Sequence, residues 1–110
     1  MKTTIAILAV VISTSANAYF LTGNDLLTRM SGTESDRHLA QAYVAGAFDA
    51  YQGTLHCAPQ SVTLSQVADM AAAYLIANPA VRNKPADELI GRMLLAAWAC
   101  PKKPAAGVTL

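Results

Sequence analysis

The chain has 110 residues, of which 54% are hydrophobic and 14% are charged, and its formal net charge is +1. A chain of this length forms a single domain. Nucleic acids and anionic membranes bind proteins that concentrate lysine and arginine, and this composition does not. We therefore expect neither a nucleic acid nor a membrane surface as a partner.

The N-terminus has the layout of an export signal. Lys2 supplies a short basic region, residues 5–12 are apolar, and Ala16-Asn17-Ala18 matches the A-x-A cleavage pattern. A helix of about eight residues is about 12 Å long, which is too short for a hydrocarbon core of about 30 Å. The sequence predicts cleavage after Ala18 and a periplasmic protein, which consists of an α-helical domain (19–100) and a flexible C-terminal tail (101–110).

The first helix is predicted over residues 24–30, with Thr22 as its N-cap and Asp25 favourable at its positive end. The second is predicted over residues 36–53, where apolar residues recur at helical spacing. No segment shows the sustained alternation of a strand. The fold class is therefore all-α, a compact bundle of four to five helices.

The second helix carries a line of small residues, Ala42, Gly46 and Ala50, at four-residue steps. We interpret Gly46 as a packing residue that lets another backbone approach closely. Asp49 lies beside this line, and a buried carboxylate without a partner is costly. We therefore expect Asp49 to tie helices together as a hydrogen-bond acceptor, with direct contact to a partner as the alternative.

Thr63 and Gln66 form a T-x-x-Q capping box that opens the third helix, and Asn78-Pro79 ends it. Pro85 suits the first position of a fourth helix, which ends at Cys100-Pro101. The polar loop 78–85 between them contains Arg82, Asn83 and Lys84, and arginine is over-represented at interface hot spots. These three residues are candidates for partner contact, and an ordinary helix connector is the alternative.

The two cysteines, Cys57 and Cys100, are predicted to form a disulfide, as short exported chains with an even cysteine count usually do. Closing a loop of about 43 residues stabilises a fold by about 4 kcal/mol in the chain-entropy model. A metal site and a catalytic thiol are the alternatives. Zinc needs three or four ligands in a recognisable pattern, and His38 and His56 make none with the cysteines. We expect no metal and no cofactor.

Motifs for catalysis are absent from the sequence: it has no G-x-S-x-G, no H-E-x-x-H and no glycine-rich phosphate loop. Neither His38 nor His56 has a nucleophile at a diagnostic spacing. The pair Asp87-Glu88 is explained by the electrostatics of a helix start. An enzyme is therefore not expected.

Six short motifs occur in a distinctive order between Thr22 and Cys100. They are T-G-N-D-L-L (22–27), Y-V-A-G-A-F-D-A (43–50), H-C-A-P (56–59), V-T-L-S-Q-V (62–67), Y-L-I-A-N-P (74–79) and A-W-A-C (97–100). In these motifs the chain resembles the type VI secretion amidase immunity proteins, also called the resistance-associated protein (Rap) immunity family.

The resemblance implies a small periplasmic helical protein that binds a peptidoglycan amidase effector and blocks its cleft with a protruding segment. It also implies a homodimer. Many relatives carry a second cysteine pair, near the end of the first helix and just before the Y-x-x-G motif. Residues 27–30 and 38–42 lack it here, so we expect the first helix to be less firmly tied down.

Two other functions remain open from the sequence. A periplasmic acid-stress chaperone also combines a signal peptide, a small helical domain and one disulfide. Such chaperones are richly charged and carry a lysine-rich tail, which this chain lacks. The third possibility is a member of the immunity family that has lost its effector.

Overall fold

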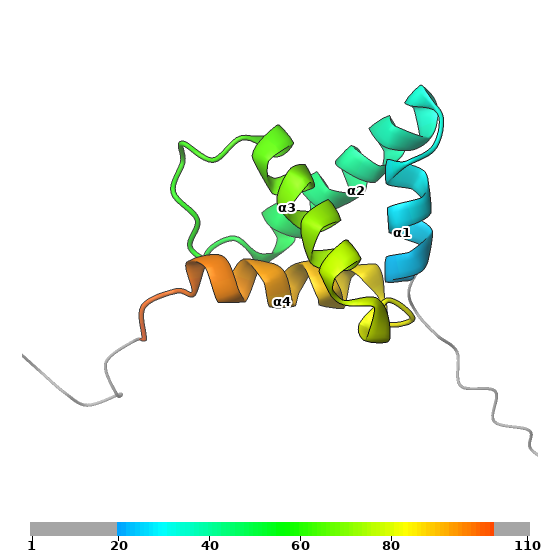
Figure 1. Cartoon of the computed structure of the whole chain (residues 1–110). Helices are drawn as coiled ribbons and strands as arrows, with labels where there is room; N and C mark the ends of the chain where they lie inside the picture. The colour runs from blue at the N-terminus through cyan, green and yellow to red at the C-terminus, as the bar shows by residue number, and fades with distance from the viewer. Residues whose placement is uncertain (1–19, 103–110) are drawn as a thin grey trace, which may run out of the picture.

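The computed structural model describes residues 20–102, and all of them except the chain ends and connections are helical. Over these residues the elements are α1 (Gly23–Met30), α2 (Glu34–Tyr51), α3 (Leu64–Ala77), the 3₁₀ helix η1 (Pro79–Val81) and α4 (Ala86–Trp98) (Figure 1). This confirms the predicted all-α bundle of four to five helices. The predicted signal peptide (1–18) and residues 103–110 of the predicted tail lie outside the described residues.

The helices α1, α2 and α3 begin where threonine side chains accept hydrogen bonds from the first turn. Thr22 and Thr33 each form a complete capping box, with Asp25 and Asp36 returning the bond to the backbone N–H of the cap. Thr63 accepts a bond of 3.1 Å from the backbone N–H of Gln66. This bond confirms one of the two bonds of the predicted capping box. The other, in which the Gln66 side chain would accept from the Thr63 backbone N–H, is absent among the described contacts.

Several helix boundaries differ from the prediction by one or two residues. The helix α2 begins at Glu34, two residues earlier than predicted, because Thr33 caps it. It ends at Tyr51 because the next residues turn away, and Gly53 has a φ of 83°, a left-handed conformation that suits glycine. Pro85 stands just before α4 and is not its first residue.

The end of α4 also differs from the predicted one. The helix ends at Trp98, and Ala99 is extended with φ −54° and ψ 135°. In this conformation Ala99 pairs with His56 in an isolated antiparallel β-bridge. The extended backbone carries Cys100 to Cys57, and the predicted disulfide is confirmed, with Cα atoms 4.7 Å apart.

The hydrophobic core lies where α4 crosses the other helices (Figure 1). Each pair of the four α-helices is in contact. The helix α4 supplies the largest share of the buried residues because its apolar positions recur at three- and four-residue steps. The buried apolar side chains are Leu26, Ala40, Val44, Ala58, Val67, Ala71, Leu75, Ala86, Leu89, Ile90, Met93 and Leu94. Among the described helices, none is long and apolar enough to cross a membrane.

Candidate partner-binding surface

The loop between α3 and α4, which carries the predicted contact residues, has a fixed backbone. Its carbonyls accept hydrogen bonds from the first turn of α1: Gly23 N–H to Lys84 O at 3.0 Å, and Asn24 N–H to Arg82 O at 2.8 Å. Ala86 N–H in turn donates to Leu21 O at 2.8 Å. Figure 1 shows the connection beside the start of α1. The loop is therefore held in one shape before any partner arrives.

Gly23 makes this close approach possible. A Cβ atom at this position would lie 2.5 Å from Leu89 Cδ1 and 3.0 Å from the Arg82 carbonyl oxygen. The absence of a side chain lets α1 and the loop share backbone hydrogen bonds. These bonds and the capping box hold α1 in place, and Leu26 on this helix is fully buried. Whether α1 is more loosely held than in relatives with a second cysteine pair stays a prediction.

The predicted contact residues all lie on this fixed loop, with different exposure. Asn83 is exposed, whereas Arg82 and Lys84 are partly buried. Within residues 20–102 neither basic side chain forms an ion pair, and Arg82 Nε is buried without a hydrogen-bond partner. The structure thus brings together two positive charges that no neighbouring carboxylate in the described chain neutralises.

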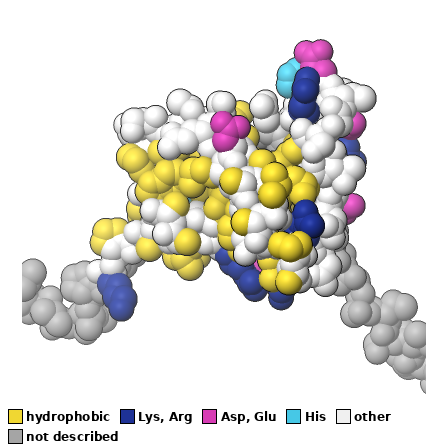
Figure 2. All heavy atoms as spheres, in the orientation of Figure 1, with side chains coloured by type: hydrophobic (Ala, Val, Ile, Leu, Met, Phe, Trp, Pro, Cys, Tyr) yellow, Lys and Arg dark blue, Asp and Glu magenta, His cyan; other side chains and the backbone are white. Residues whose placement is uncertain are grey.

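Beside this loop, the end of α3 exposes apolar side chains to solvent. Ile76 is 64% exposed, and Ala73, Ala77 and Ala80 are exposed too. Figure 2 shows the side on which α3 lies in front: hydrophobic and uncharged side chains cover most of it, and basic side chains gather along its lower edge near the α3–α4 connection. We name the segment Asn78–Pro85 together with the exposed end of α3 the basic edge.

Gly46 and Asp49 lie elsewhere, and the structural roles expected for them are not found within the described chain. No atom lies within 4 Å of a Cβ built on Gly46, and Ala42 and Ala50 are also exposed. Asp49 is exposed and takes part in no described ion pair or side-chain hydrogen bond. The reason is a rotation of α2: Ala40 and Val44 face the core, which turns the small-residue line to solvent.

His56 is the residue whose importance the sequence did not reveal. It is fully buried, and its Nε2 lies 2.9 Å from the Phe48 carbonyl oxygen. The centroids of the His56 and Phe48 rings are 4.5 Å apart. Its Nδ1 has no partner among the described residues. His38, in contrast, is exposed near the start of α2. His56 therefore packs the connector against the core and is not available to a substrate.

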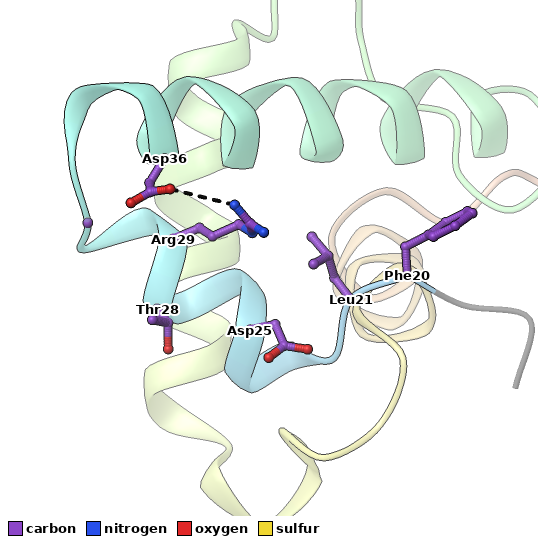
Figure 3. Close-up of a pocket in the computed structure, with 7 residues that line it drawn as sticks. Phe20, Leu21, Asp25, Thr28, Arg29 and Asp36 are labelled. Carbon is purple, nitrogen blue, oxygen red and sulfur yellow. Dashed lines mark ion pairs between the residues drawn. The ribbon is translucent and has the colours of Figure 1, made fainter.

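An open cleft lies between the chain entry and the α1–α2 turn (Figure 3). Its volume is about 520 Å³, and it is lined by Phe20, Leu21, Asp25, Thr28, Arg29, Gly32 and Asp36. Arg29 forms an ion pair with Asp36 at 3.5 Å across it. The Asp25 carboxylate accepts a hydrogen bond of 3.0 Å from the Thr22 backbone N–H. This bond, and then the Thr22 hydroxyl beside it, hold the pKa of the Asp25 carboxyl below its ordinary value. The charged groups of this cleft thus serve the local structure.

The carboxyl end of α2 and the start of α4 are joined by a tyrosine. Tyr51 donates a hydrogen bond to Asp87 Oδ2 at 3.3 Å. Burial, and then the charge of Asp87, raise the pKa of both Tyr43 and Tyr51. Both phenols therefore stay protonated at neutral pH. Within the described residues there is no group of three His, Cys, Asp or Glu side chains that could hold a metal ion.

Comparison with known proteins gives one family. The model of the Rap1a immunity proteins matches residues 22–100, which include all the helices and both cysteines. The first and last motifs of the sequence, T-G-N-D-L-L and A-W-A-C, lie at the two ends of this match. Among curated proteins, none matches the chain.

Proposed function

The chain belongs to the Rap1a immunity protein family, and we propose that it is a periplasmic immunity protein that inhibits a peptidoglycan amidase effector of a type VI secretion system. The protein binds the amidase and occludes the active-site cleft of that enzyme. The family match across residues 22–100 carries this proposal, because it spans the whole helical domain.

The basic edge is the surface that we assign to the amidase. Its backbone is already fixed by the hydrogen bonds to α1, so little conformational entropy is lost when it enters a cleft. Arg82 and Lys84 carry charges without an ion pair in the described chain, and Arg82 Nε still lacks a hydrogen-bond partner. A carboxylate of the amidase would pair with the Arg82 and Lys84 charges.

Occlusion requires no catalytic group on the inhibitor, and the side chains described above fit this role. The histidines lie apart, one in the core and one on the surface, and the cysteines form a disulfide. We also propose that the protein is a homodimer, as the family resemblance implies. Light scattering coupled to size-exclusion chromatography tests this part separately, and a monomer at micromolar concentration would contradict it.

The first experiment asks whether the protein protects cells. The chain is expressed with its own signal peptide in cells that produce an amidase in the periplasm, with amidases encoded beside its gene as candidates. We expect survival with the cognate amidase and lysis without the immunity protein. Failure against every candidate would contradict the proposed function and favour the acid-stress chaperone.

The second experiment locates the contact. Arg82→Ala and Lys84→Ala remove the two charges and leave the loop backbone hydrogen bonds in place. Truncation of a hot-spot arginine weakens binding by about 30-fold or more, so inhibition of peptidoglycan hydrolysis should need correspondingly more protein. Arg37→Ala is the matched control, because Arg37 is exposed near the start of α2 and lies outside the basic edge. Equal inhibition by Arg82→Ala, Lys84→Ala and wild type would remove the basic edge from the proposal.

A further inference from the structure

A second surface of the molecule has a hollow that the basic edge does not include. It lies between the carboxyl-terminal half of α2 and the start of α3, and its volume is about 180 Å³. Its lining is mostly apolar and comprises Ala45, Phe48, Asp49, Val62, Thr63, Leu64 and Val67. We name this hollow the α2–α3 groove.

The groove contains a single charged side chain, that of Asp49. The Asp49 carboxylate is exposed and has no ion-pair or hydrogen-bond partner among residues 20–102. A charge at the edge of an apolar hollow interacts more strongly with an opposite charge once the hollow is filled, because water is excluded and the effective dielectric constant falls. The groove is therefore complementary to a cation on an apolar stem.

The walls of the groove are already in place in the free protein. Phe48 packs against the buried His56 ring, Val67 is buried in the core, and Thr63 is fixed by its capping bond to Gln66. Leu64, which is 44% exposed, forms an outer rim. A ligand would thus meet a site whose walls are preformed.

We propose that the α2–α3 groove is a second docking point for the same effector and receives a lysine or arginine side chain of the effector. The aliphatic stem of that side chain lies against Phe48, Val62 and Leu64, and its charged head pairs with Asp49. Lysine and arginine place their stems on apolar surface and their heads on polar groups in this way. This inference rests on the proposed function.

The size of a stable interface favours one effector that contacts both surfaces. A specific complex buries about 800 Å² on each partner, which an eight-residue loop alone does not supply. The groove lies where α3 begins, and the basic edge lies where it ends. A helix of 14 residues is about 21 Å long, which is within the reach of a small globular domain.

A second copy of this chain is the alternative occupant of the groove. Two of its arginines, Arg29 and Arg92, are engaged in ion pairs within their own chain. Arg82 and Lys84 belong to the basic edge, which the proposed function assigns to the amidase. Arg37 of a second copy is exposed and forms no ion pair in the described chain, so the test below reads the oligomeric state beside the affinity for the amidase.

The test uses full-length mature protein and an amidase that the wild type inhibits. Asp49→Asn removes the charge with little change in shape, and Asp49→Lys reverses it. We expect the dissociation constant to rise about tenfold for Asp49→Asn and further for Asp49→Lys, as for a desolvated charge pair that loses one partner. The wild-type affinity should also fall with added salt more steeply than that of Asp49→Asn.

Glu34→Gln and Glu34→Lys are the matched controls, because Glu34 is an exposed carboxylate at the other end of the same helix. Their affinity should stay within about twofold of the wild type, since a charge outside the interface contributes little. Melting temperatures of all four variants should remain close to that of the wild type. Such melting curves show that any loss of affinity is not a loss of fold.

The outcomes separate this inference from the proposed function. If the wild type binds no candidate amidase, the proposed function fails. If the wild type inhibits and Asp49→Lys inhibits equally well, the proposed function stands and the groove is not a docking point. If Asp49→Lys converts a dimer to a monomer without changing amidase affinity, a second copy occupies the groove and the inference is wrong.

Discussion

The two ends of α4 are attached to the rest of the molecule in different ways. At its start, several backbone hydrogen bonds join residues 82–86 to the segment around Gly23, and no covalent link is involved. At its end, one disulfide and one fully buried ring, His56, join the helix to the α2–α3 connector. The first attachment is spread over many weak contacts, and the second is concentrated in two groups.

The difference shows how each attachment suits the surface that it holds. The backbone bonds use up carbonyls and N–H groups and leave the side chains of Arg82, Asn83 and Lys84 free for a partner. His56 is buried, and together with the disulfide it fixes the connector that leads into Val62 and Thr63 at the α2–α3 groove. The attachment at the start of α4 therefore presents side chains to a partner. The attachment at its end holds a wall of the α2–α3 groove in place.

The disulfide end should show the largest effect when broken. Cys57→Ser opens a loop with a sequence separation of 43, which should lower the free energy of unfolding by about 4 kcal/mol in the chain-entropy model. Urea denaturation under oxidising conditions measures this. The wild type in reducing buffer serves as the control and should approach the variant, and an unchanged melting temperature would contradict a stabilising disulfide.

The second component of that end is the His56 ring. His56→Ala removes a fully buried side chain and leaves the Phe48 carbonyl without its ring partner. The cavity and the lost hydrogen bond should together cost roughly 3 kcal/mol. Thermal unfolding with the disulfide intact measures the effect. His38→Ala, at an exposed position, should change stability by less than about 0.5 kcal/mol.

The opposite end of α4 is tested by Gly23→Ala. The new Cβ would lie 2.5 Å from Leu89 Cδ1 and 3.0 Å from the Arg82 carbonyl oxygen, so the buried Leu89 side chain must move and the loop must give slightly. Overpacking of this kind should destabilise by about 2 kcal/mol. Gly46→Ala is the matched control, because it has free space and should stabilise α2 by about 0.5–1 kcal/mol. Equal effects at the two glycines would show that α1 and the loop are not tightly joined.

The smallest expected effect is on the stability of the fold at acidic pH. The Thr22 backbone N–H and hydroxyl hold the pKa of Asp25 below its ordinary value of 3.8. A carboxyl whose pKa is lowered by folding stabilises the protein above its unfolded pKa, and this stabilisation is lost as pH falls through the folded value. Asp25→Asn should therefore lower the melting temperature at pH 7. The difference in melting temperature between the variant and the wild type should shrink as the pH falls below 3.8. Asp69→Asn, without a capping bond, should leave that pH dependence unchanged.

Local signals in the sequence predicted much of this structure. The cap at Thr22, the cap at Thr63 and the end of α3 before Pro79 follow from side chains that act on their own neighbours. The disulfide followed from cysteine count and compartment, and it is present. Interactions over short sequence distances are readable because the chain itself fixes their geometry.

The roles of particular residues across the fold were not readable in this way. Gly23, which the sequence showed only as part of a motif, permits the contact between α1 and the loop. Gly46, read as a packing residue, faces open space. Both are glycines in helices, and only the positions of distant helices distinguish them.

The sequence by itself determined the fold class, the paired cysteines and the family, since these depend on composition, local capping and the order of short motifs. Only the tertiary structure decided that His56 lies in the core and that Asp49 stands alone at an apolar groove. The physical reason is the rotation of each helix about its axis. That rotation is set by how all four helices share one core, and it fixes which side chains remain for a partner.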